Sequence, residues 1–172
     1  MAKSREHALI AKMSAVAVFG ALSFVMTAFL KIPYAGNAGY FNFGDIVTLL
    51  ASMVLGPIEG ALIGIVGGAL SDLFLGYAFY APWTILAKGL MGLATGFLYS
   101  VLKNKKGLRF ISPFVGGTFE VLAYLLCYYV LLGTGGLINS AFDCVQAYGS
   151  AIIAIPLYLA VEKAHVVEHF QE

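Results

Sequence analysis

The sequence predicts an all-α integral membrane protein, a bundle of six transmembrane helices with both termini in the cytoplasm. Hydrophobic residues make up 60% of the 172 positions and charged residues only 11%, against roughly 45–50% and about 25% in soluble globular domains. The chain holds five apolar stretches long enough to cross a bilayer, which takes about 20 residues. Its basic residues gather in particular connecting segments. These observations indicate a protein whose main partner is the lipid bilayer.

The five long stretches define most of the bundle. They are Ala8–Leu30, Pro57–Leu75, Pro82–Leu102, Phe110–Leu132 and Leu137–Val161. The first is too long for the apolar core of a cleavable signal, and no small-residue cleavage site follows it, so we expect it to stay in the chain. A sixth stretch, Ile46–Leu55, has half the usual length. Its pattern fits both a short tilted span and a re-entrant segment.

The distribution of charge decides whether Ile46–Leu55 crosses the membrane. If it does, both termini and the loop Lys103–Arg109 face one side, with Lys31 alone on the other. The first side then carries Lys3, Arg5, Lys12, Lys103, Lys105, Lys106, Arg109 and Lys163. If it does not, the basic loop lies across the membrane from the N-terminal cluster, against the positive-inside rule. The rule therefore favours six spans with cytoplasmic termini.

The connections between the stretches predict a single domain over residues 1–172. Most of them are short, which makes consecutive helices antiparallel neighbours. The outer loop 31–44 is longer and mixes Gly36 and Gly39 with aromatic residues. We expect this loop to fold over a bound molecule as a lid.

Two glycine stripes end in charged residues. Gly56, Gly60, Gly64 and Gly68 follow one another at intervals of four and lead to Asp72, and Lys88 begins a similar stripe with Gly92 and Gly96. Glycines in such stripes let helix backbones approach closely in lipid, so we interpret them as packing surfaces. The two charges need a separate explanation.

Four ionisable residues share one level near the outer side of the six-span arrangement. They are Asp45, Asp72, Lys88 and Asp143, and Asn139 and Gln146 lie close to Asp143 in the sequence. A charge inside a membrane costs at least ~2.5–3.5 kcal/mol and usually faces a wet cavity or the bundle interior. We therefore expect a polar cavity open to the outside. Two structural alternatives stay open: an Asp72–Lys88 ion pair between helices, and a helix cap at Asp45.

Glu120 lies near the middle of its predicted helix, with Tyr124 and Tyr128 one and two turns further along the same face. A carboxylate at this depth is a functional candidate. A protonated carboxyl hydrogen-bonded to a tyrosine is the equal alternative.

Among the aromatic residues, several belong to the interfacial belt, and Tyr80 and Trp83 beside the polar level are the preferred candidates for ring stacking.

The sequence lacks the motifs that are typical of several classes of function. The chain has no phosphate-binding loop and neither H-E-x-x-H nor G-x-S-x-G, and its histidines fall outside the spans. Cys127 and Cys144 lie in apolar stretches, and we interpret them as buried hydrophobic residues. A net charge of +1 gives no reason to expect nucleic acid. We expect no enzyme, no catalytic residue and no metal site.

The first helix carries small residues at helical spacing. Ala11 with Ala15, and Ala17 with Ala21, form two small-xxx-small pairs on different faces. Such pairs permit close helix packing, either within the chain or against another protein.

Together these pieces resemble the S component, the substrate-binding subunit, of energy-coupling factor (ECF) vitamin transporters of the riboflavin-transporter-like group. The likeness covers nearly the whole chain and includes the helix plan and the alanines. Its motifs are Tyr40-Phe41-Asn42-Phe43-Gly44-Asp45, Leu55-Gly56-Pro57, Gly67-Gly68-Ala69-Leu70-Ser71-Asp72, Tyr80-Ala81-Pro82 and Lys88-Gly89.

The resemblance implies a subunit of a prokaryotic cell membrane that captures a vitamin from outside. In that family one transmembrane coupling protein and two ATPase subunits drive uptake and hydrolyse the ATP, so the chain itself needs no cofactor. Small residues of the first helix contact the coupling protein, which makes Ala11, Ala15, Ala17 and Ala21 the candidates. The substrate lies on the outer side, under the first loop, and members with similar motifs have been linked to hydroxymethylpyrimidine or vitamin B6 compounds.

The candidate substrate-binding residues combine the polar level, the nearby aromatic residues and the loop motif. They are Tyr40, Asn42, Asp45, Asp72, Tyr80, Trp83, Lys88, Glu120, Tyr124, Asn139, Asp143 and Gln146. The alternative function is a self-contained ion-coupled secondary transporter or channel that uses the embedded charges as an ion path. No inverted repeat, which many such proteins carry, is visible in the sequence. A purely structural assembly subunit would leave the polar level unexplained.

Overall fold

A computed structural model describes residues 2–34, 39–105, 107–164 and 167 of the chain. Within these described residues, four stretches are long and apolar enough to cross a membrane, namely Leu9–Ala28, Pro57–Phe74, Ala81–Leu102 and Leu108–Lys163. The last stretch holds two successive helices, and Gly44–Leu55 is a shorter apolar helix. The helical membrane architecture expected from the composition is therefore confirmed.

The α-helices begin and end close to the predicted boundaries. They are α1 (Ala2–Ala28), α2 (Gly44–Leu55), α3 (Pro57–Phe74), α4 (Ala81–Leu102), α5 (Ser112–Leu132) and α6 (Asn139–Lys163). Two 3-10 turns, η2 (Leu108–Ile111) and η3 (Gly133–Ile138), precede α5 and α6. Proline occupies the first turn of α3, α4 and α5, where its fixed φ suits a helix start and its missing N–H costs nothing. Between α2 and α3, Gly56 has φ 117° and makes the turn possible.

The loop 31–44 contains a small sheet that the sequence pattern did not predict. Strands β1 (Lys31–Tyr34) and β2 (Gly39–Asn42) pair in an antiparallel register that sets Lys31 opposite Asn42. Residues 35–38 lie outside the described residues, and with them Gly36. The hairpin ends two residues before α2, so its last residue, Asn42, stands directly at the start of that helix.

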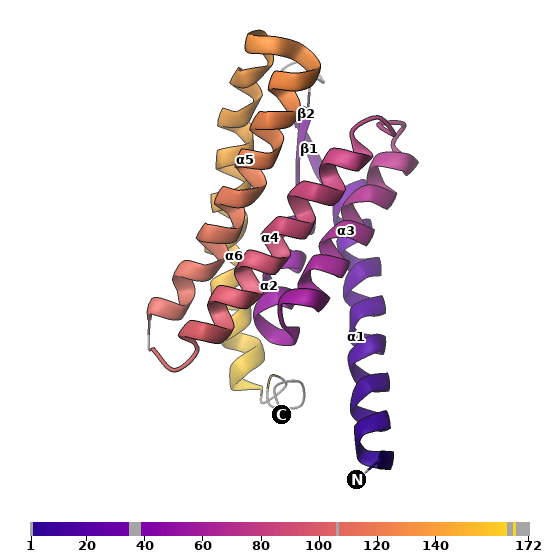
Figure 1. The fold of residues 1–172 in the computed structure, drawn as a ribbon, viewed down its shortest axis with the longest axis vertical. Helices are drawn as coiled ribbons and strands as arrows, with labels where there is room; N and C mark the ends of the chain where they lie inside the picture. Colours follow the sequence, from indigo (N-terminus) through magenta and orange to yellow (C-terminus); the bar gives the residue numbers. More distant parts are fainter. Residues whose placement is uncertain (1, 35–38, 106, 165–166, 168–172) are drawn as a thin grey trace.

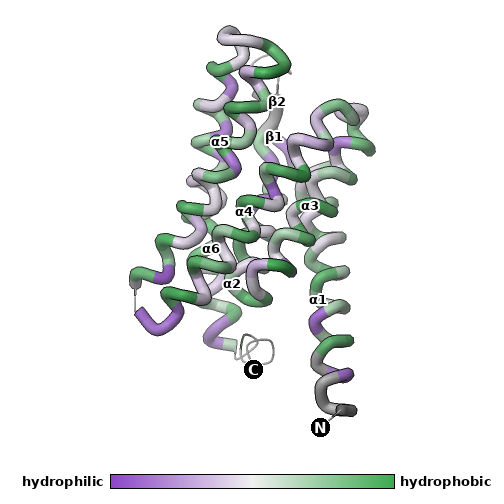
Figure 2. Tube along the Cα trace, in the orientation of Figure 1, coloured by the Kyte–Doolittle hydropathy of each residue, from purple (hydrophilic) through white to green (hydrophobic). Residues whose placement is uncertain are grey.

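The two ends of the molecule differ in what they contain. Figure 1 shows the start of α1, the end of α6 and the connection between α4 and α5 at one end, and the hairpin with the connection between α3 and α4 at the other. We call these the lower end and the upper end. In Figure 2, strongly hydrophilic segments concentrate at the lower end, whereas the helices between the ends are largely apolar.

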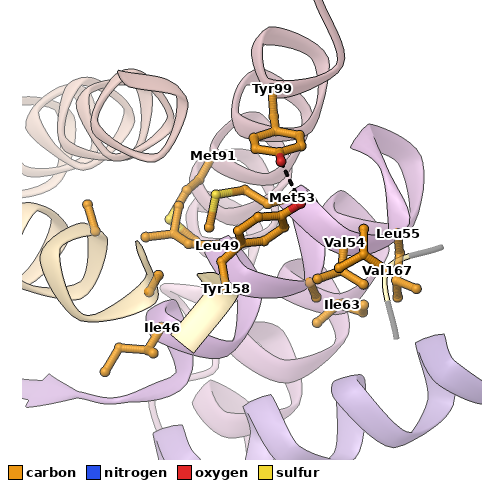
Figure 3. Close-up of a cluster of buried hydrophobic side chains, with 13 residues drawn as sticks. Ile46, Leu49, Met53, Val54, Leu55, Ile63, Met91, Tyr99, Tyr158 and Val167 are labelled. Atoms are coloured by element: carbon orange, nitrogen blue, oxygen red, sulfur yellow. Dashed lines mark hydrogen bonds between the residues drawn. The ribbon is translucent and has the colours of Figure 1, made fainter. Parts of the chain in front are cut away.

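Helix α2 forms the centre of the bundle and is buried along nearly its whole length. It contacts α1, α3, α4 and α6. Leu49 and Met53 of α2 belong to the buried apolar cluster drawn in Figure 3, together with Met91 and the hydrogen-bonded rings of Tyr99 and Tyr158. A helix of 12 residues is thus enclosed by longer neighbours, which explains why its short apolar run holds few polar positions.

The glycine stripes do hold helices together, as expected. A Cβ atom added at Gly92 would lie 2.5 Å from the backbone nitrogen of Ala61, and one at Gly96 would lie 2.5 Å from the Cα of Pro57. Both distances are far below van der Waals contact, so only glycine permits α4 to lie this close to α3. The same close approach places the polar residues of α4 next to those of α2 and α3.

Candidate functional site

A buried ion cluster lies in the interior of the bundle. The ammonium of Lys88, on α4, donates hydrogen bonds to Asp45 Oδ1 on α2 and to Glu120 Oε1 on α5. The side chains of Lys88, Asp45 and Glu120 are 6%, 1% and 2% exposed. A charge buried to this degree is tolerated only when paired, so the three residues form one unit that joins three helices.

Local packing fixes the position of each member of the cluster. A Cβ at Gly44 would lie 2.9 Å from the carbonyl oxygen of Ser23, so the glycine allows the start of α2 to press against α1. Gly44 also donates its N–H to Asn42 Oδ1 at 3.1 Å. This orients the first turn of α2 and carries Asp45 inward. On α3, Gly68 makes room for the aliphatic stem of Lys88, whose Cγ would lie 3.1 Å from an added Cβ.

Gln146 of α6 connects the ion cluster to the hairpin. Its amide Nε2 donates to Asp45 Oδ2 at 2.6 Å, and its Oε1 accepts the backbone N–H of Asn42 at 3.1 Å. Thr27 of α1 donates to Asn42 Oδ1 at 3.4 Å. The end of β2 is therefore held by α1 and α6 at once, directly above the charged groups.

A second group of polar side chains surrounds the cluster. The hydroxyls of Tyr124 and Thr84 are 3.0 Å apart, and the ring centre of Tyr124 lies 5.8 Å from Lys88 Nζ. Thr84 is also within hydrogen-bonding reach of Asp72. On the other side, Tyr128 donates to Asp143 Oδ1 at 3.4 Å. Asp72 and Asp143 both lie near enough to Lys88 to interact with it electrostatically.

Three carboxylate oxygens in this region have no hydrogen-bond partner among the described residues. They are Asp72 Oδ2, Glu120 Oε2 and Asp143 Oδ2. Buried polar atoms in folded proteins nearly always have a partner, so orphaned acceptors of this kind call for an explanation. Their chemistry suits a molecule that brings N–H or O–H donors into the site.

The structure brings together much of the predicted set. Asn42, Asp45, Lys88, Glu120 and Gln146 form one connected network, and Asp72, Tyr124 and Asp143 border it. No binding role of these residues is tested by their positions alone, so each remains a prediction.

The other predicted substrate-binding residues have no described contact with this network. Tyr80 is half-buried with its ring centre 4.2 Å from that of Phe79, and Trp83 is half-buried in the first turn of α4. Asn139 begins α6 one turn before Asp143. The backbone of Tyr40 pairs in the hairpin, and its side chain lies outside the described residues.

Two structural alternatives raised by the sequence are corrected. The ion pairs that Lys88 makes among the described residues are with Asp45 and Glu120, so the proposed Asp72–Lys88 pair is wrong. Asp45 does not cap α2 either, because the cap position belongs to Phe43 and the Asp45 side chain receives Lys88 and Gln146 instead. Thr84 was overlooked, although it lies one turn before Lys88 on the same face of α4.

The alanines of α1 divide by exposure. Ala15 packs against the apolar core with Val16 and Phe19. Ala11, Ala17 and Ala21 are exposed, and the last two are one turn apart on the same face. The pair Ala17 and Ala21 thus presents an open small-residue surface, whereas the pair of Ala11 and Ala15 is half-covered by the protein itself.

A cavity of about 160 Å³ lies away from the ion cluster. It opens between the end of α2 and the lower half of α4, and its lining includes Met53, Leu55, Tyr99 and Lys103. None of the predicted substrate-binding residues contributes to it.

Comparisons with known proteins agree over almost the whole chain. Residues 8–163 match the family model of the ECF-type riboflavin transporter S component. An uncharacterized protein in gap 3'region of Pyrococcus woesei is 37% identical over 130 residues, 75% of this chain and 86% of that protein. A UPF0397 protein of Streptococcus pneumoniae (strain Taiwan19F-14) is 27% identical over 136 residues, 78% of this chain and 74% of its own.

The fold has a solved counterpart. A chain described as the S component of a bacterial ECF transporter superposes with a TM-score of 0.72 and 22% sequence identity, covering 90% of this chain and 97% of its own length. At this identity the likeness establishes the fold. The family match and the membrane helices together identify a prokaryotic membrane protein of a transport system: this chain belongs to the family of ECF-type riboflavin transporter S components.

Proposed function

We propose that this chain captures a small water-soluble vitamin or vitamin precursor from outside the cell and delivers it to an ATP-driven importer. Membership of the S component family supports a substrate-binding subunit. The observation that carries the proposal for this chain is the buried network of Asp45, Lys88, Glu120 and Gln146 directly beneath the hairpin. Charged groups at this depth in a membrane protein usually mark a substrate path or site.

In the proposed arrangement all six helices cross the membrane, the lower end faces the cytoplasm and the hairpin covers the outer side. The basic residues at the lower end support this orientation. The hairpin then acts as a lid, because its last residue is fastened to the network through Gln146. Opening the lid would expose the polar groups to the outside solution.

The best candidates for the substrate are hydroxymethylpyrimidine and vitamin B6 compounds. Both are flat heteroaromatic rings that carry several hydrogen-bond donors, which matches the unpartnered carboxylate oxygens. The ring would stack on an aromatic side chain, for which Tyr80, Trp83 and Tyr124 are the candidates, and its substituents would bond to the polar groups around Lys88. Pockets of this kind join a mostly apolar lining to a few polar groups that fix orientation.

The importer would include a transmembrane coupling protein and two ATPase subunits. The exposed pair Ala17 and Ala21 on α1 supports a contact with the coupling protein, because small residues let a partner helix approach closely. ATP would be hydrolysed by the partner subunits, and this chain would bind substrate without a cofactor.

One experiment separates this proposal from a self-contained transporter. The chain is placed in liposomes alone and together with the coupling protein and its ATPases, and uptake of labelled hydroxymethylpyrimidine and pyridoxine is followed with and without ATP inside. Uptake that needs both the partners and ATP is expected. Robust uptake by the chain alone would contradict the proposal, and mass spectrometry of ligand retained during purification would identify the natural substrate.

A further inference from the structure

The cavity between α2 and α4 lies outside the candidate substrate site, and its lining has a different chemistry. Met53, Val54 and Leu55 of α2 line one side, and each is at most 3% exposed. Figure 3 shows these side chains in the apolar core of the bundle. Ser100 and Lys103 of α4 line the other side and are exposed, so they stand at the mouth. The interior is therefore largely apolar, and its mouth is polar.

Lys103 is the one charged residue among the described residues that line the cavity. The hydroxyls of Ser52 and Ser100 donate to backbone carbonyl oxygens of their own helices, and that of Tyr99 donates to Tyr158. The ammonium of Lys103 makes no ion pair with any described residue. Its charge and its three N–H donors are thus available to a bound molecule.

The surroundings of the mouth do not cancel this charge. Glu59, in the first turn of α3, lies near the cavity, because its Oε2 would be 3.0 Å from a Cβ added at Gly56. Lys12 of α1 neutralises this carboxylate through a 2.7 Å ion pair. Lys105 adds another exposed cation in the connection after α4. The mouth therefore favours an anion.

Lys103 also lies at the height of the lipid headgroups. It directly follows Ala81–Leu102, the stretch of α4 that is long and apolar enough to cross a membrane. Figure 2 shows the change from largely apolar helix to hydrophilic connection at this point of the lower end. A lysine just beyond a membrane-crossing helix extends its ammonium to the interface, where headgroup phosphates lie.

We propose that this cavity binds an anionic phospholipid from the leaflet that meets the lower end. The headgroup phosphate pairs with the ammonium of Lys103, and the first carbons of an acyl chain enter the apolar interior beside Met53 and Leu55. Basic pockets between transmembrane helices bind anionic headgroups in this way. The inference goes beyond the proposed function, because none of the candidate substrate-binding residues lines the cavity.

Other occupants fit the cavity less well. A free phosphate uses the cation and leaves the apolar interior empty, and a neutral lipid fills the interior without using the cation. A helix of a partner protein is about 10–12 Å wide, which is too large for about 160 Å³. An amphiphile with an anionic head satisfies both parts of the lining at once.

The test compares two lipids that differ in headgroup charge. Phosphatidylglycerol and phosphatidylcholine with the same acyl chains are titrated separately into the purified full chain, from which bound lipid has been removed, and native mass spectrometry measures the bound fraction. Phosphatidylglycerol should bind about fivefold more tightly, the effect of one lysine beside an anionic headgroup. Glycerol phosphate, which has the anion without acyl chains, should not displace it at about 1 mM.

Variants show whether the cavity causes this preference. Lys103→Gln removes the cation and should bring the ratio of the two affinities close to one. Lys105→Gln is the matched control, because it removes a cation from the same connection without touching the lining, and its ratio should stay unchanged. Ser100→Leu adds apolar atoms at the mouth and should weaken both lipids about fourfold, as expected when the cavity takes one methylene group fewer. The replaced residues are exposed, so all three variants should melt like the parent.

Several outcomes would overturn the inference. Equal affinities of the parent for the two lipids would do so. An equal loss of preference in Lys105→Gln would show that the whole basic connection attracts the lipid, and unchanged binding in Ser100→Leu would place the acyl chain elsewhere. Displacement by glycerol phosphate would make the cavity a site for a free phosphate. Vitamin uptake enters none of these measurements, so the inference and the proposed function fail independently.

Discussion

The side-chain amide of Gln146 donates a 2.6 Å hydrogen bond to Asp45 Oδ2, although the two residues are 101 positions apart in the chain. The same amide accepts the backbone N–H of Asn42 through its oxygen. One side chain thus contacts both the ion cluster and the end of the hairpin. If a bound ligand shifts Asp45, Gln146 would transmit that shift to the end of the hairpin. This gives a physical basis for coupling ligand binding to the position of the hairpin.

Replacing this intermediary should weaken binding. In Gln146→Leu, Asp45 Oδ2 and the N–H of Asn42 lose their partner, and each unsatisfied buried group costs about 1–3 kcal/mol. We expect a loss of about tenfold to a hundredfold in affinity, together with faster amide hydrogen exchange in residues 39–42. Tyr148→Phe is the control, because it removes a hydrogen bond of the same helix on its exposed side. If both variants bind like the parent, Gln146 plays no part in the site.

Lys88 should matter for stability far more than an ion pair nearer the surface. Lys88→Met leaves Asp45 and Glu120 buried without their cation, and breaking such a pair typically costs about 3–5 kcal/mol. Lys12→Met breaks the 2.7 Å pair with Glu59, whose members are 34% and 19% exposed, and should cost only ~0–1 kcal/mol. Thermal unfolding of both variants in the same detergent provides the measurement. Similar shifts in melting temperature would argue against the buried cluster described here.

Asp72 should behave differently from the partners of Lys88. Because it makes no ion pair with Lys88 and one of its oxygens is unpartnered, Asp72→Asn should change stability little. It should still weaken substrate binding, since it replaces one of the acceptor oxygens at the site by an amide nitrogen, which donates hydrogen bonds instead of accepting them. Melting curves and calorimetry on this variant are compared with those of Lys88→Met. If the melting temperature falls as far in Asp72→Asn as in Lys88→Met, Asp72 and Lys88 form an ion pair after all.

The sequence was sufficient for the helices because their signals are local. Runs of about 20 apolar residues, a proline in the first turn and a Gly56-Pro57 junction each state where a helix begins or ends. The hairpin was missed because its strands have four residues each and lack a strict alternation of polar and apolar positions. Its pairing depends on contacts with α1 and α6 that are remote in sequence.

The sequence predicted which residues gather at the site, but only part of the hydrogen bonds and ion pairs between them. Helical periodicity orders residues along one face of a helix, and so it grouped Glu120 with Tyr124. It does not say how neighbouring helices are rotated. The partners of Lys88 depend on Gly68, which lets its stem lie against α3 while the ammonium reaches Asp45 and Glu120. That choice is made by packing, which a pattern of spacings does not contain.

The orientation in the membrane is tested by labelling. The connection around Lys105 belongs to the lower end with the start of α1 and the end of α6, and Gly135 belongs to the opposite end. The basic residues of the lower end predict that Lys105 and both termini are cytoplasmic and that Gly36 and Gly135 face outward. Cys127 and Cys144 are replaced first, and single cysteines at 105 and 135 are treated with a membrane-impermeant reagent in intact cells. Labelling at 105 instead of 135 would rule out the six-span arrangement.

The exposed alanines of α1 provide the test of the partner contact. Ala17 and Ala21 face away from the rest of the chain, so a leucine at either position fits the isolated protein and should leave substrate affinity and melting temperature unchanged. In the assembled importer the added side chain would hold the coupling protein away from α1, because close approach of two helices in lipid depends on small residues at the contact. We therefore expect ATP-driven uptake to fall at least tenfold in Ala21→Leu.

Ala15→Leu should instead lower the melting temperature, because Ala15 packs against the core and overpacking costs about 1–3 kcal/mol. Ala160→Leu, at an exposed position of α6, controls for the general effect of an added apolar side chain. Uptake and copurification of the ATPases are measured for all three variants, and if Ala21→Leu retains both at parental levels, the coupling protein binds a different face.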